Sequence, residues 1–145
     1  MNILKILTPQ RQTGNLGERA ALKLLRLKGY RILEKNYTAN GAEIDVIAKR
    51  LGITAFVEVK ARNIKSLGQY QSRPAAAVTP EKQRKIIRVA EHYARRRNLK
   101  TRMRFDVVEI YLEDTPRGVK IKDKKHLEGA FDKNTAYKGY IPKGK

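Results

Sequence analysis

The fold of this chain is decided by two segments, Glu43-Ile-Asp45-Val-Ile-Ala48 and Ala55-Phe-Val-Glu58-Val-Lys60. Both alternate apolar and charged residues with the two-residue period of a half-buried β-strand. Residues 49–52 between them form a short connection, which favours a β-hairpin. We expect one face of this hairpin to carry the charged residues Glu43, Asp45, Glu58 and Lys60, and the other face to carry Ile44, Val46, Val57 and Val59.

The charged face of this hairpin holds more negative than positive charge. Two carboxylates about 4 Å apart repel by about 4 kcal/mol at an effective dielectric constant near 20. Lys60 alone cannot neutralise the carboxylates, whereas a divalent cation can. The pattern therefore predicts a metal site, with the alternative that these residues form an ordinary solvated strand face.

The remaining segments predict one α/β domain in which helices flank a mixed β-sheet. We expect helices at residues 15–29 and 79–97, and further strands at residues 30–33, 104–112 and 118–121. Residues 36–41 and 63–78 are predicted to be connections. Thr79 and Pro80 are a strong helix start, and Asn15 with Glu18 resembles a capping box. Along the chain we predict a leader at residues 1–13, the domain at 14–131 and a basic, mobile tail at 132–145.

The composition indicates a polyanionic partner. The 145 residues suffice for one domain, and 33 lysines and arginines against 14 acidic residues give a net charge of +19. Such a charge favours nucleic acid or an anionic membrane or ribosome surface. No apolar run approaches the roughly 20 residues of a membrane span. The absence of cysteine and of a signal-peptide pattern fits a cytoplasmic protein.

Four motifs stand out in the chain: Gly17-Glu-Arg-Ala20, Glu43-Ile-Asp45, Phe56-Val-Glu58-Val-Lys60-Ala-Arg62 and Arg104-Phe-Asp-Val-Val108. Together they resemble those of the YraN-like proteins, which are related to archaeal Holliday-junction resolvases and the PD-(D/E)xK nuclease superfamily. The resemblance spans residues 14–131, although Ala42 stands where the family usually has glycine. It implies a restriction-endonuclease-like fold and, because resolvases act on two scissile strands, a homodimer.

The same resemblance implies a set of site residues. Glu18, Asp45 and Glu58 match acids that bind Mg²⁺ or Mn²⁺, and Asp45, Glu58 and Lys60 match the catalytic residues. Lys60 would orient or deprotonate the attacking water, or stabilise the transition state. Glu43 faces the same way as Asp45, so it is either a direct ligand or a support for one.

Basic residues near these strands are expected to bind nucleic acid through its phosphates, and therefore by shape rather than sequence. They are Arg62, Lys65, Arg73, Lys82, Lys85 and Arg88. The predicted function is a metal-dependent endonuclease acting on DNA, including branched or flapped DNA, in recombination, repair or uptake. The alternative is a non-catalytic nucleic-acid-binding module with the same fold, and DNA is favoured over RNA. His126 is expected to be structural, and Asp106 either belongs to the family pattern or pairs with a nearby arginine.

Overall fold

In the part of the chain that the structure describes, five strands form a single sheet, and helices lie on both of its faces. The computed structural model describes residues 9–64 and 78–137, with side chains from residue 15 onward. The elements are α1 (Pro9–Leu27), β1 (Arg31–Ala39), β2 (Ala42–Arg50), β3 (Ile53–Asn63), α2 (Pro80–Arg96), β4 (Arg102–Thr115), β5 (Gly118–Phe131) and α3 (Lys133–Ala136).

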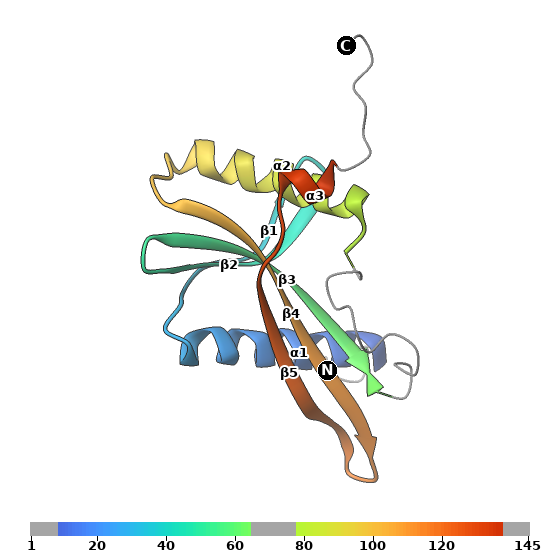
Figure 1. The fold of residues 1–145 in the computed structure, drawn as a ribbon. Coiled ribbons are helices and arrows are strands. Elements are labelled where there is room, and N and C mark those ends of the chain that lie inside the picture. Colours follow the sequence, from blue (N-terminus) through green and yellow to red (C-terminus); the bar gives the residue numbers. More distant parts are fainter. Residues whose placement is uncertain (1–8, 65–77, 138–145) are drawn as a thin grey trace, which may run out of the picture.

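The sheet is mixed, as predicted. Its strand order is β1-β2-β3-β4-β5, and only the β3–β4 pair is parallel. The crossover between those two parallel strands contains α2, which lies on the opposite side of the sheet from α1 (Figure 1). This arrangement confirms the α/β class and is consistent with a restriction-endonuclease-like fold. No helix within the described ranges is long and apolar enough to cross a membrane.

Tight turns join the first three strands. Asn40–Gly41 connects β1 to β2 and Leu51–Gly52 connects β2 to β3, and all four residues have positive φ between 49° and 74°. Two-residue turns with positive φ at both positions match the twist of paired strands. The predicted hairpin is therefore confirmed. The predicted connection at residues 36–41 is confirmed only for Asn40–Gly41 and is wrong for residues 36–39, because Tyr37 packs on the core and its segment continues β1 to Ala39.

The first helix begins earlier than the sequence predicted. It starts at Pro9, so Asn15 and Glu18 lie within α1 and their interpretation as a capping box is wrong. Its predicted end is confirmed: Gly29 has φ 92° and donates its N–H to Arg26 O, while Tyr30 donates to Leu25 O. These two bonds satisfy the last helical carbonyls in a Schellman arrangement. Glu18 is thereby free of a capping role.

Separate apolar clusters fill the two faces of the sheet. Phe56 and Phe105 pack beneath α2, and Phe105 also stacks on Phe131 with ring centroids 5.3 Å apart. Val57 and Val108 belong to the cluster beneath α1. Because β3 and β4 are buried on both faces, they form a rigid platform for residues that project beyond the core.

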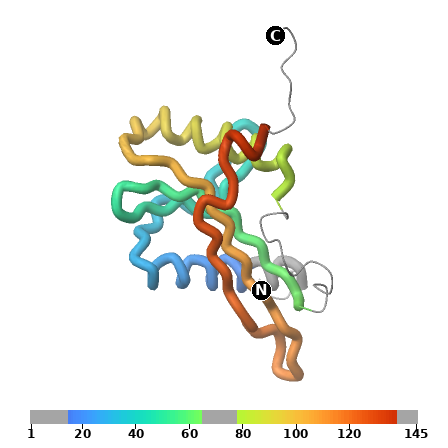
Figure 2. Tube along the Cα trace, viewed as in Figure 1, coloured from blue at the N-terminus to red at the C-terminus, as the bar shows by residue number. Residues whose placement is uncertain are grey.

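The last strand is much longer than predicted, and it is followed by a helix. β5 continues past residue 121 to Phe131 along one edge of the sheet, as the trace in Figure 2 shows. Its charged residues hide the strand pattern, and such charges are typical of exposed sheet edges. Asp132 then caps α3 through Thr135 N–H, so α3 lies within the segment predicted to be a mobile tail. Residues 138–145 lie outside the described residues.

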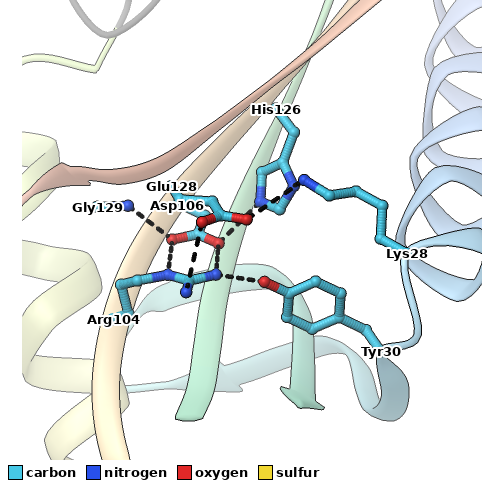
Figure 3. Close-up of polar contacts among 7 residues, drawn as sticks. All are labelled: Lys28, Tyr30, Arg104, Asp106, His126, Glu128 and Gly129. Carbon is cyan, nitrogen blue, oxygen red and sulfur yellow. Dashed lines mark hydrogen bonds and ion pairs between the residues drawn. The ribbon is translucent and has the colours of Figure 1, made fainter. Parts of the chain in front are cut away.

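A buried polar cluster around Asp106 ties the end of α1 to β4 and β5 (Figure 3). The Asp106 carboxylate is fully buried and accepts hydrogen bonds from Arg104, from His126 Nε2 at 2.8 Å and from Gly129 N–H at 3.0 Å. Lys28 Nζ lies 2.6 Å from His126 Nδ1, which therefore acts as the acceptor. The predicted pairing of Asp106 with a nearby arginine is confirmed, and His126 has a structural role within this cluster.

We expect Gly17→Ala to destabilise the protein, although alanine normally favours a helix by about 1 kcal/mol over glycine. A Cβ atom at Gly17 would lie 2.8 Å from Ala61 Cβ on β3. Relief of such a clash typically costs about 1–3 kcal/mol. Urea unfolding measures the change, and Lys23→Ala on the exposed side of α1 is the control. An increase in the free energy of unfolding for Gly17→Ala would contradict this close packing.

Candidate active site

The strands β2 and β3 separate at Asp45 and Glu58. Their pairing ends at Val46 opposite Val57. Beyond this point Asp45 Oδ2 accepts the Val59 N–H at 2.8 Å, so a carboxylate replaces a backbone partner. The expectation that Ile44 and Val46 share a face is wrong: Ile44 packs beneath α2 and Val46 beneath α1. The regular alternation fails near Asp45, where β2 no longer pairs with β3 although it still pairs with β1.

A cavity of about 440 Å³ lies between this divergence, the β1–β2 turn and the first turns of α2. Its charged lining consists of the acids Glu43, Asp45, Glu58 and Glu81 and the bases Lys82 and Lys85. Glu58 is buried, with only 5% of its surface exposed. The Thr79 cap, whose Oγ1 accepts Lys82 N–H at 3.2 Å, sets the position of this turn of α2. The cavity is therefore polar, bounded by regular elements and open to solvent.

The predicted acids act on one another electrostatically. Burial and then the charge of Glu58 raise the pKa of Asp45 to about 7, although the Val59 N–H opposes this. Glu18 on α1 and Glu43 on β2 raise the pKa of Asp45 further. The fold therefore brings these acids within electrostatic range of Asp45. Such a perturbed carboxyl in a cavity is typical of functional sites.

Two lysines share the Glu58 carboxylate. Lys82 Nζ lies 2.7 Å from Glu58 Oε1, and Lys60 Nζ lies 3.6 Å from the same oxygen. Burial and the nearby charge of Lys82 lower the pKa of Lys60. Burial alone would lower the pKa of Lys82, but its hydrogen bond and attraction to Glu58 outweigh this and raise it. The sequence indicated Lys82 as a phosphate ligand and gave no signal of this ion pair.

The donor set fits a hard divalent cation with few protein ligands. Within residues 15–64 and 78–137, no three acidic or histidine side chains are close enough together to hold a metal ion. Mg²⁺, however, commonly binds through one or two carboxylates and completes its shell with water and substrate phosphate. Asp45 and Glu58 supply such oxygen ligands, and the repulsion between them would be relieved by a cation.

The other predicted phosphate ligands are dispersed. Arg62 Nε forms an ion pair with the buried Glu109 at 3.2 Å, and Lys85 pairs with Glu81 at 3.5 Å. Arg88 is exposed on α2. Lys65 and Arg73 lie outside the described residues. Of the described basic residues, Lys82 and Lys85 line the cavity itself.

We expect Asp45→Asn to stabilise the metal-free protein above neutral pH. Because folding raises the pKa of Asp45 from 3.8 to about 7, the folded state binds more protons than the unfolded state between these two pH values. Its stability falls as pH rises through that range and stays lowered above it. Asparagine keeps an acceptor for Val59 N–H and removes the buried charge. We expect a gain on the order of 2 kcal/mol near pH 8 that disappears near pH 4.

Urea unfolding at a series of pH values in a chelating buffer measures this gain. The control is Glu81→Gln, which removes a cavity acid whose side chain is 73% exposed and paired only with Lys85 in a surface ion pair. We expect it to change stability little. Equal stability of wild type and Asp45→Asn above neutral pH would show that Asp45 carries no buried-charge penalty.

Comparison with known proteins places these residues inside a family of sequences. The family described as Uncharacterised protein family UPF0102 matches residues 17–110. The chain is 42% identical over 104 residues to the UPF0102 protein of Caldicellulosiruptor saccharolyticus, covering 71% of this chain and 85% of that one. It is 41% identical over 125 residues to that of Pelobacter propionicus, covering 84% of each. For the UPF0102 protein of Desulfosudis oleivorans the identity is 39% over 132 residues, covering 90% and 98%.

Proposed function

The chain belongs to the uncharacterised UPF0102 family, the YraN-like proteins, and we propose that it is a divalent-metal-dependent endonuclease that hydrolyses phosphodiesters in DNA. One observation carries this proposal. Asp45 and Glu58 lie where β2 and β3 separate and line one cavity together with Lys82, and Lys60 lies beside Glu58. Burial first, and then the charge of Glu58, raises the pKa of Asp45, and a bound cation would favour its ionised form.

Asp45 and Glu58 would hold Mg²⁺ or Mn²⁺, with Glu18 and Glu43 adding negative potential around Asp45. The bound cation would supply positive charge for the phosphoryl oxygens and an acidified water. Lys60 has two chemically distinct roles available. Its lowered pKa increases the fraction of neutral amine that can accept a proton from water. In its charged form it offsets negative charge on the phosphoryl group.

Nucleic acid is the substrate class that best fits the charge of the chain. The net charge of +19 favours a polyanion, and Lys82 and Lys85 line the cavity, where we propose that they contact its phosphates. Phosphate contacts do not read sequence, so we propose recognition of DNA shape, including branched and flapped structures. A four-way junction has two scissile strands, and because of the resemblance to resolvases, which act on both, we propose a homodimer. The proposed location is the cytoplasm, where chromosomal DNA of bacteria lies.

The ion pair between Lys82 and Glu58 favours a second candidate function. Because Lys82 lies 2.7 Å from Glu58 and Lys60 lies 3.6 Å away, this carboxylate already has cationic partners without a metal. Such pairing of Glu58 with lysines is what we expect of a protein that keeps this fold but does not hydrolyse phosphodiesters. This second candidate is a module that binds DNA or structured RNA without cleaving it.

A cleavage assay separates the two candidates. Wild-type protein is incubated with Mg²⁺ or Mn²⁺ and labelled duplex, single-stranded, flapped and four-way DNA, with matched RNA and with a chelator. We expect cation-dependent cuts in DNA that the chelator abolishes. Salt-sensitive binding that needs no cation and yields no product on any substrate would refute the endonuclease and support the binding module.

A further inference from the structure

The Lys82–Glu58 ion pair joins a fixed group to a movable one. Glu58 is only 5% exposed and projects from β3, a strand buried in the middle of the sheet. Lys82 starts from the first turn of α2, and 43% of its side chain is exposed. The carboxylate is therefore held by the sheet, whereas the ammonium lies on a flexible, solvent-facing stem. Breaking this contact requires only rotation of the Lys82 side chain.

Glu58 also has more cationic partners than one carboxylate needs. Lys60 Nζ and Lys82 Nζ approach the same oxygen, Oε1, at 3.6 and 2.7 Å. If Lys82 leaves, Lys60 remains beside Glu58 and the buried carboxylate keeps a counterion. By contrast, the closer ammonium of Lys82 cannot share Oε1 with a divalent cation, because the two positive groups would repel at that distance.

We propose that Lys82 is an internal counterion that pairs with Glu58 in the metal-free protein. A divalent cation that binds Glu58 replaces Lys82 there, and the freed Lys82 ammonium then binds a backbone phosphate of the nucleic acid. This inference rests on the proposed function and adds to it a residue that positions the substrate. Lys82 stays at the cavity after the exchange, because its backbone is fixed by the Thr79 cap. A phosphate entering the cavity meets the freed ammonium there.

The exchange couples two binding events. Cation binding releases Lys82 for phosphate, and phosphate withdraws Lys82 from Glu58, so each ligand raises the affinity for the other. This coupling is reciprocal by thermodynamic linkage. A site of this kind binds the cation weakly when no nucleic acid is present, because the charged Lys82 competes with the cation for Glu58.

Calorimetric titration with Mn²⁺ alone tests the first half of the exchange. We expect Lys82→Gln to bind Mn²⁺ about tenfold more tightly than wild type, which corresponds to about 1.4 kcal/mol. Arg95→Gln removes an equal charge from the exposed surface of the same helix, and Arg95 does not line the cavity, so its affinity should stay within about twofold of wild type. Lys82→Arg keeps the charge and should keep the weak affinity.

The second half is tested by the salt dependence of binding to a short DNA duplex, read by anisotropy before cleavage accumulates. Adding Mn²⁺ should steepen the slope of log affinity against log salt by about 0.9 in wild type, the value for one new phosphate contact. In Lys82→Gln this additional slope should be lost. The duplex is the probe in both cases.

The possible failures are distinguishable. If Lys82→Gln binds Mn²⁺ no more tightly than wild type, the exchange is wrong while the endonuclease proposal stands. An equal increase in the Mn²⁺ affinity of Arg95→Gln would likewise overturn it, because the effect would then come from general charge. If no variant binds Mn²⁺ even with the duplex present, the proposed function fails and the exchange fails with it.

Discussion

Glu58→Gln and Asp45→Asn are each expected to reduce cation-dependent DNA cleavage by about a thousandfold or more, a loss of about 4 kcal/mol of transition-state stabilisation. Both changes keep the size of the side chain and remove a negative charge from the cavity. A divalent cation bound by two carboxylates would lose one of its charged ligands. Cleavage kinetics on the best substrate of the panel, with Mg²⁺ in excess, measure the reduction.

The stability of the same variants shows whether a loss of cleavage comes from a missing catalytic group or from unfolding. Asp45→Asn retains the acceptor for Val59 N–H and should be more stable than wild type above neutral pH, yet inactive. A variant that gains stability and loses activity has lost a group that was kept for function. Asp123→Asn, an exposed residue on β5, is the control and should cleave like wild type. Undiminished cleavage by Glu58→Gln would refute this catalytic role.

The hairpin at the centre of the site was predictable because its signals are local. The alternation in Glu43–Ala48 and Ala55–Lys60 has the strand period, and a two-residue turn joins β2 to β3. The second helix was equally clear, since Thr79 and Pro80 start it as predicted. Local patterns of this kind depend on neighbouring residues and need no knowledge of the rest of the fold.

The contacts that shape the site depend on residues far apart in the sequence. Lys82 reaches Glu58 across 24 positions, through the orientation of α2 over the sheet. Asp45 accepts the Val59 N–H because β2 and β3 separate there. The alternation of apolar and charged residues does not indicate where two paired strands separate. The length of β5 was underestimated for a related reason. This strand is held by its hydrogen bonds to β4, whereas its own exposed, charged residues have the composition of a loop.

Asp106→Ala is expected to destabilise the protein by about 3–5 kcal/mol, the usual cost of removing one partner from a buried ion pair. The fully buried carboxylate accepts two hydrogen bonds from Arg104, one from His126 and one from Gly129 N–H (Figure 3). Arg104 is only 22% exposed and His126 only 3%, so both would keep buried polar groups without this acceptor. Urea unfolding at neutral pH measures the loss.

The pH dependence of this loss identifies its cause. Burial alone would raise the pKa of Asp106, but its bonds from Arg104, His126 and Gly129 outweigh burial and lower it. A lowered pKa in the folded state gives stability that is present above the unfolded pKa and is lost as pH falls through the folded value. The difference between wild type and Asp106→Ala should therefore shrink in acid, whereas a loss due to packing alone would not change.

A double-mutant cycle with Arg104 tests whether the cluster acts as a unit. If the Arg104 guanidinium destabilises the protein only when Asp106 is absent, the two substitutions are not additive. Adding Arg104→Ala to Asp106→Ala should then lower the free energy of unfolding much less than Arg104→Ala does alone. Asp123→Ala, an exposed acid on the same strand as His126, should change stability by less than about 0.5 kcal/mol. Additive effects of Arg104 and Asp106 would mean that each stabilises the fold separately. In that case the bonds between them would not be what ties the end of α1 to β4 and β5.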